Sequence, residues 1–285
     1  MDAEAVQQIL QDIEDKILNN VNLGFDPEVL SVLSNADAEE NEIEVLKSKI
    51  AGEILARLFS VANSIYFGHL RRGNIDTFYK VVSRLGMDSA RVLIIFLSFA
   101  ALSKDREVLT ICAKSTATSI VGGRILAEEF GLKENEARKV EIAGLFFEMG
   151  RVIFALYKSL HKEDYEKAGI GEDFIAEHQS YFGLKIVEKF NLPEFLKDII
   201  STKYLTLEAE LLSLAGIVMI ANSTVDMSFR RFGNKLVIVS PMPDPEGKIV
   251  HTIGAVIEEI FKAVGLRGYI EIHKPPEPDQ KSSKG

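Results

Sequence analysis

The sequence predicts an all-α protein, and three observations support that fold class. Apolar residues recur at helical spacing through most of the 285 residues, and Gly, Pro, Asn and Asp separate the apolar runs. No segment before residue 234 has the short β-branched pattern that is typical of a strand. Hydrophobic residues make up 47% of the chain and charged residues 26%, so one large domain or two small ones can bury an ample core.

The first 104 residues are predicted to form a series of helices. Asp26 offers a capping carboxylate ahead of Pro27 and Glu28, which is the residue order of a helix start. Gly86 is expected to end the helix before it, because glycine tolerates the backbone conformation found at helix C-termini. The predicted helices span residues 4–20, 26–34, 43–51, 52–62, 76–85 and 90–102, with an acidic turn at 37–41 and an aromatic turn at 62–68.

Longer helices are predicted beyond residue 105, over residues 108–130, 134–157, 173–190, 191–204 and 207–227. After them, residues 235–240 and 269–272 are predicted strands that could pair as a small ribbon, on either side of an amphipathic helix at 250–264. The Pro-rich residues 275–285 have the composition of a disordered tail. We therefore expect two helical subdomains, 1–104 and 105–228, and a C-terminal extension, 229–274.

The bulk properties exclude several function classes. A net charge of −9 argues against a nucleic-acid-binding surface, which needs clustered Lys and Arg. The most apolar run, residues 92–102, is too short to span a bilayer and is predicted to be a core helix buried on all sides. The single cysteine, Cys112, allows no intrachain disulfide and is interpreted as a small buried side chain. We expect a cytoplasmic protein with no nucleic-acid or membrane partner and no cofactor.

The segment Ala143–Phe154, with the sequence AGLFFEMGRVIF, contains two charged residues within an apolar run. Gly144 and Gly150 would allow neighbouring helices to approach closely. A buried carboxylate such as Glu148 is costly unless it is paired or binds a cation. The central question about this segment is therefore which group Glu148 faces.

Several motifs resemble the HDOD family, over about residues 20–225. The residues that carry the resemblance are Leu55-Ala56-Arg57-Leu58, Ala62-Asn63-Ser64, Tyr66, Gly68, Leu85-Gly86, Arg91, Gly144-Leu145, Gly150-Arg151, His178 with Gly183, and Leu192-Pro193. HDOD proteins are bacterial, all-helical signalling output modules related to the metal-dependent phosphohydrolases of the HD type. The resemblance therefore implies a multi-helix bundle and a role in signal transduction.

The resemblance also implies that the ancestral metal site is degenerate. Phe147 and Glu148 stand where active HD hydrolases have their adjacent His-Asp pair. The other ligand positions align with Lys114, with Lys203 and with Asn222, and His178 alone remains as a histidine. One Glu and one His are too few ligands for a divalent cation, and without a metal no water is activated for hydrolysis. We expect no metal, no catalytic residue, and a lysine, either Lys114 or Lys203, that neutralises Glu148.

Three functions stay open at this point. The first is a non-catalytic regulatory module that contacts signalling proteins in trans, with homodimerisation or partner binding through the 250–264 helix. The second is a residual metal-dependent phosphohydrolase that uses Glu148 and His178, although a structural hydrogen bond is the plainer role for that histidine. The third is a sensor that binds a nucleotide or other small anion through Lys114, Arg151 or Lys203.

A loop in the first subdomain is a further candidate contact site for a partner or an anion. The plainer interpretation is a solvated basic turn, because it carries only two or three positive charges. Its candidate residues are Asn63, Ser64, Tyr66, His69, Arg71 and Arg72.

Overall fold

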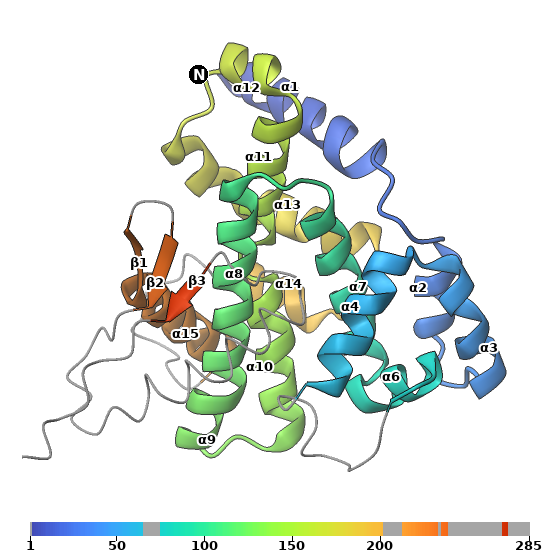
Figure 1. Ribbon diagram of the computed structural model, residues 1–285. Coiled ribbons are helices and arrows are strands. Elements are labelled where there is room, and N and C mark those ends of the chain that lie inside the picture. The colour runs from blue at the N-terminus through green and yellow to red at the C-terminus, as the bar shows by residue number, and fades with distance from the viewer. Residues whose placement is uncertain (1, 65–74, 202–212, 233–234, 239–269, 273–285) are drawn as a thin grey trace, which may run out of the picture.

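The computed structural model in Figure 1 describes residues 2–64, 75–201, 213–232, 235–238 and 270–272 and shows a multi-helix bundle. The all-α prediction is confirmed. The predictions that concern Tyr66, His69, Arg71, Arg72 and Lys203 lie outside the described residues, as do the 250–264 helix and the 275–285 tail. Among the helices that the structure describes, none has both the length and the apolar character that a membrane crossing requires.

Three N-terminal helices pack against one buried helix, α7 (Met87–Ala101): α2 (Glu28–Leu33), α4 (Gly52–Asn63) and α6 (Phe78–Leu85). As predicted, α7 is buried on all sides. Asp26 accepts a hydrogen bond from the Glu28 amide at 2.8 Å, and Gly86 ends α6 with a φ of 84°, so both predicted helix boundaries are confirmed. The elements are α1 (Ala3–Ile13), the π-helical segment η1 (Glu14–Asn19), α2 (Glu28–Leu33), α3 (Glu40–Val45), the 3-10 segment η2 (Leu46–Lys49), α4 (Gly52–Asn63), α6 (Phe78–Leu85) and α7 (Met87–Ala101).

The second group of helices is centred on α8 and α10, which pack against each other and against α15. The connection at residues 102–105 joins α7 to α8. The elements are α8 (Arg106–Ile120), the π-helical segment η3 (Val121–Leu126), α9 (Ala127–Glu129), α10 (Glu134–Phe146), α11 (Met149–Leu160), α12 (Lys162–Ala168), α13 (Glu172–Lys189), α14 (Phe195–Ser201) and α15 (Leu214–Ser228).

One long helix was predicted over residues 134–157, and this is wrong: a turn at Phe147–Glu148 separates α10 from α11. The turn residues include no Gly or Pro, so tertiary packing must impose the break. Gly144 lets α10 approach the backbone of α8, and Gly150 lets α11 approach the backbone of α13. We attribute the turn to these two contacts, which direct α10 and α11 towards different neighbours. The short helix α12, at 162–168, was also not predicted.

A small sheet follows α15 and is visible beside that helix in Figure 1. Strand β2 (Lys235–Ile238) pairs in parallel with β3 (Ile270–Ile272), so the predicted ribbon is confirmed. A third strand, β1 (Phe229–Phe232), pairs antiparallel with β2 and was not predicted, because two arginines weaken the apolar signal of this segment.

Candidate functional site

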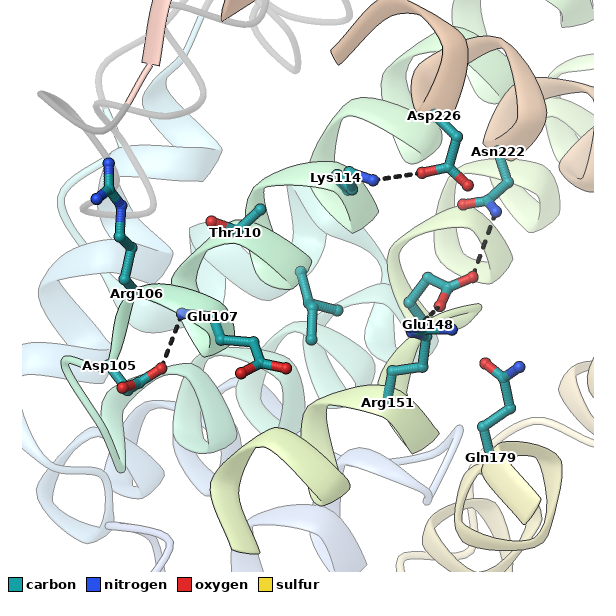
Figure 2. Close-up of a pocket in the computed structure, with 11 residues that line it drawn as sticks. Asp105, Arg106, Glu107, Thr110, Lys114, Glu148, Arg151, Gln179, Asn222 and Asp226 are labelled. Atoms are coloured by element: carbon teal, nitrogen blue, oxygen red, sulfur yellow. Dashed lines mark hydrogen bonds and ion pairs between the residues drawn. The ribbon is translucent and has the colours of Figure 1, made fainter. Parts of the chain in front are cut away.

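A pocket of about 940 Å³ opens among α8, α11, α13 and α15 (Figure 2). This is large enough for a small-molecule ligand or for a few residues of a partner. Four of the predicted site residues line it: Lys114, Glu148, Arg151 and Asn222. The other lining residues are Asp105, Arg106, Glu107, Thr110, Ile111, Gln179 and Asp226.

Two glycines of the segment 143–154 hold the pocket helices together. A Cβ built on Gly150 would lie 1.8 Å from the Gln179 carbonyl oxygen, so α11 touches the backbone of α13. A Cβ on Gly144 would lie 2.8 Å from the Ser119 backbone, so α10 touches α8. Both predicted close approaches are confirmed. They fix Glu148, which lies between the two glycines, at the wall of the pocket.

Glu148 is 9% exposed and is held by polar neighbours. The Asn222 side-chain amide donates to its carboxylate at 3.3 Å, and the Arg151 Nε lies 3.7 Å from its second oxygen. The Thr118 hydroxyl donates a hydrogen bond to the side-chain oxygen (Oδ1) of Asn222 at 3.2 Å. This contact orients the Asn222 side-chain amide so that its NH2 group points towards Glu148. Arg151 also pairs with Glu172. The buried carboxylate is therefore compensated by an arginine in the first turn of α11, three residues further along the chain, and by an amide from α15.

Of the two lysines predicted to neutralise Glu148, Lys114 pairs with another residue, and Lys203 lies outside the described residues. Among the described residues, Lys114 pairs with Asp226, with 2.5 Å between Nζ and the carboxylate oxygen (Figure 2). Asn222 and Asp226 are four residues apart on α15 and so lie one turn apart on one face. The first of them reaches Glu148 and the second reaches Lys114.

Phe147 and His178, which the resemblance also placed at the degenerate metal site, are not among the residues that line the pocket. Phe147 is 6% exposed and belongs to the hydrophobic core. The His178 ring packs against Phe174 with 4.4 Å between ring centroids, and its Nε2 lies 3.9 Å from the Glu177 carboxylate. The next residue on α13, Gln179, is buried and lines the pocket instead.

Sequence reasoning also missed the contribution of the α8 N-terminus. Residues 107, 110, 111 and 114 recur at intervals of three and four, so they share one face of that helix and all line the pocket. This spacing, read outwards from Lys114, is the signal that could have identified them. Asp105 caps α8 by accepting from the Glu107 amide at 2.8 Å.

The two described residues of the candidate loop make structural contacts. Asn63 donates its amide to the Ile75 carbonyl at 3.2 Å and accepts from the Ile75 amide at the same distance. Ser64 is buried and donates to the Val61 carbonyl at 2.7 Å. The two Asn63 hydrogen bonds connect the C-terminus of α4 to the residues just before α6, and the Ser64 hydrogen bond closes the end of α4 itself.

The donor set at the pocket does not fit a metal ion. Within the part of the chain that the structure describes, no three His, Cys, Asp or Glu side chains gather in a way that could hold one. The two carboxylates nearest the Asn222 face are each within ion-pair distance of a cation, Glu148 of Arg151 and Asp226 of Lys114. Ammonium and guanidinium groups in these positions repel a divalent cation.

Comparisons with known proteins identify the fold and the family. Residues 26–205 match the model of the HDOD domain. A crystal structure from Shewanella amazonensis SB2B, named "Putative metal-dependent phosphohydrolase", matches with a TM-score of 0.55 and 16% identity and covers 92% of this chain and 96% of that chain. A second, "Putative phosphohydrolase" from the same organism, has a TM-score of 0.54 and 16% identity, with 92% and 94% covered.

An HDOD domain protein of unknown function from Geobacter sulfurreducens has a TM-score of 0.50 and 19% identity, with 92% of this chain and 90% of that chain covered. At these identities the structural likeness shows the fold alone. No curated protein matches the sequence. The family model spans well over half of the chain, and on that ground the chain belongs to the HDOD domain family.

Proposed function

We propose that the chain is a non-catalytic regulatory module of a bacterial signalling system, cytoplasmic, that acts through contacts with other proteins. The observation that carries the proposal is the ion pairing in the pocket. Glu148 faces Arg151 and Asn222, and Asp226 faces Lys114. By the resemblance, Glu148, Asn222 and Lys114 stand at positions where a hydrolase of the related HD type presents ligands to a metal. Removing a metal site while keeping its pocket is what we expect of a module whose role is recognition.

The charges of the pocket favour a polypeptide partner over a small anion. The described lining residues include four carboxylates, Asp105, Glu107, Glu148 and Asp226, against three cations, Arg106, Lys114 and Arg151. A nucleotide or phosphate would meet more negative than positive charge there. A polypeptide, in contrast, presents both signs together with backbone groups for the Gln179 and Asn222 amides. Contact with a protein therefore ranks above the anion-sensor function.

The hydrolase alternative is tested on the purified full-length chain. Metal content is measured after incubation with Mn²⁺ and with Zn²⁺, and hydrolysis of bis(p-nitrophenyl) phosphate is followed in the same samples. We expect no stoichiometric metal and no turnover that depends on Glu148, so that wild type, Glu148→Gln and the exposed-residue control Glu129→Gln behave alike. Stoichiometric metal with turnover that Glu148→Gln abolishes and Glu129→Gln preserves would overturn the proposal.

The recognition role is tested with a charge reversal at the rim of the pocket. Asp226→Lys places two cations side by side, and Lys114→Glu combined with it restores an ion pair of opposite polarity. We expect proteins of the native host that bind the immobilised wild-type chain to be lost with Asp226→Lys while the variant stays folded. Identical binding profiles for wild type and Asp226→Lys would show that the pocket does not recognise a partner.

A further inference from the structure

The N-terminal segment Ala3–Asn19, made of α1 and η1 and called the latch below, lies outside the family match, which begins at residue 26. It nevertheless packs against α11, at the far end of the chain's second group of helices. In Figure 1, α1 lies beside α11 and away from α2 and α3, the helices that follow it in the sequence. The latch thus packs on the second group of helices although the family match does not include it.

The apolar part of this contact is a stripe of five aliphatic side chains. Ile13, Ile17 and Leu18 are fully or almost fully buried, and Ile9 and Leu10 are partly buried against the core. The π-helical geometry of η1 shifts the helical register by one residue where these side chains meet the fold. Such π segments are rare and are frequently found at functional sites.

The rest of the contact is a row of polar side-chain pairs. The Tyr157 hydroxyl donates to Asp12, and the Tyr181 hydroxyl donates to Glu14 at 2.9 Å. Lys16 pairs with Asp164 at 2.8 Å, which is the one pair with the opposite polarity. The row is completed by Lys185 with Glu14 at 3.3 Å and Lys189 with Asn19 at 2.7 Å.

These pairs define which kind of helix can bind the surface that the latch covers. The surface of α11, α12 and α13 presents two hydroxyl donors, two lysines and one carboxylate, so it fits a helix edge with several acceptors and one base. Lys16 and Asp164 have side chains 30% and 41% exposed, and water can therefore replace their contact at low cost. The surface also lies on α11 and α13, the helices that carry Arg151 and Gln179 to the pocket.

We infer that this face of α11, α12 and α13 is a docking surface for an amphipathic helix, and that the latch is a displaceable occupant. A partner helix that fits this surface has an aliphatic stripe and, beside it, two acids and a lysine. In the latch these positions are Asp12, Glu14 and Lys16. By occupying the surface, the latch competes with such a helix and lowers the apparent affinity of the chain for it. This inference rests on the proposed role in protein recognition and supplies its mode of regulation.

The experiment uses the full-length chain and, as a probe, a fluorescent peptide of residues 1–22. Lys16→Glu in the chain places a third acid beside Asp12 and Asp164 and so weakens the binding of the latch to its surface. The control is Lys104→Glu, which changes the net charge equally at an exposed position. We expect the peptide to bind Lys16→Glu at least about tenfold more tightly than wild type or Lys104→Glu, because a resident competitor lowers apparent affinity by the fraction of open surface. A peptide in which Asp12 and Glu14 are both alanine should bind more weakly.

Two results would overturn the inference. One is a folded Lys16→Glu chain, with cooperative unfolding, that binds the peptide no better than Lys104→Glu does. The other is read on the wild type without any variant: amide exchange of residues 3–19 that occurs only with global unfolding, at the rate of the buried α7 amides, would show that the latch does not open. Both measurements are independent of metal content and turnover, so they distinguish failure of the latch from failure of the non-catalytic proposal.

Discussion

Helices α11 and α13 make two contacts of opposite character, one with each other and one with the latch. Where they meet each other, Gly150 brings α11 against the Gln179 backbone, and no side chain can be added between them. Where they meet the latch, the contact consists of three buried aliphatic residues and a row of hydrogen bonds and ion pairs between long side chains. The first contact has one geometry and positions the pocket, whereas the second can be broken and remade.

The largest effect is expected at the rigid contact, from Gly150→Ala. Its Cβ would lie 1.8 Å from the Gln179 oxygen, which requires the backbone of α11 or α13 to move. Overpacking typically costs about 1–3 kcal/mol and occasionally more, and we expect this change at or above about 3 kcal/mol, with Gly144→Ala next at 2.8 Å from backbone atoms. The free energy of unfolding is measured by urea denaturation.

Gly52→Ala is the matched control, because nothing lies within 4 Å of its added Cβ at the start of α4. There we expect no loss of stability, or a gain of up to about 1 kcal/mol from the reduced entropy of the unfolded chain. A cost below about 1 kcal/mol for Gly150→Ala would mean that the α11–α13 contact is as adaptable as the latch, and the contrast between the two regions would disappear.

The next largest effect concerns the ion pairs that line the pocket. In a double-mutant cycle, Glu148→Gln and Arg151→Met should couple by about 1 kcal/mol, a value kept low because the Arg151 side chain is 30% exposed. The cycle of Glu148→Gln with Lys114→Met should be additive within about 0.5 kcal/mol, since Lys114 pairs with Asp226. Strong coupling in the second cycle would instead restore the lysine partner that the sequence suggested for Glu148.

The rigid region was largely predictable from the sequence. Apolar spacing located most of the helices, the two glycines of Ala143–Phe154 indicated the close contacts, and the family resemblance selected four residues that do converge on one pocket. The break at Phe147–Glu148 was not predictable, because no helix-breaking residue marks it and packing against two different helices decides it. The buried Cys112 was predicted correctly, and burial raises the pKa of its thiol to about 12.

The polar contacts left no comparable signal in the sequence. Whether an amide or a lysine from elsewhere in the chain meets Glu148 depends on the rotation of α15 about its axis, which apolar periodicity does not specify. The latch pairs join residues 145 to 171 positions apart, such as Asp12 with Tyr157 and Glu14 with Lys185. In the sequence, each of these residues has the pattern of a solvated helix face. Only the three-dimensional arrangement brings the residues of the latch and of α11, α12 and α13 into contact.

A smaller effect is expected at the latch from Tyr157→Phe. This change removes the hydroxyl that donates to Asp12 and keeps the ring in the core, so it should cost about 1 kcal/mol, the typical net value of one hydrogen bond. Amide exchange of residues 3–19 should accelerate, while exchange in α7 should change only by the global loss. Equal acceleration in both segments would indicate that the latch unfolds only together with the rest of the chain.

The smallest expected effect is the pH dependence of the latch. The hydrogen bond from Lys16 holds the pKa of Asp164 below its ordinary value, with weaker contributions from Lys167 and His161. A depressed carboxyl pKa stabilises the docked state above the ordinary value of about 3.9, and this contribution is lost as the pH falls through the folded-state pKa. The hydrogen bonds that Lys16 donates to Asp164 and Asp12 raise the pKa of Lys16, so its contribution to stability is complete below about pH 10.4 and is lost only as the pH rises through the raised pKa.

Latch opening, followed by amide exchange of residues 3–19 relative to α7, should therefore be constant between about pH 5 and 9 and should increase below about pH 4. Asp164→Asn should increase opening slightly at neutral pH and should make the increase in opening at acid pH smaller. The reason is that it removes one of the two carboxylates that pair with Lys16, while Asp12 remains. The exposed Glu129→Gln should leave the profile unchanged. If opening at acid pH increases as much in Asp164→Asn as in the wild type, the pH dependence comes from other carboxylates. The Lys16–Asp164 pair would then contribute nothing to holding the latch.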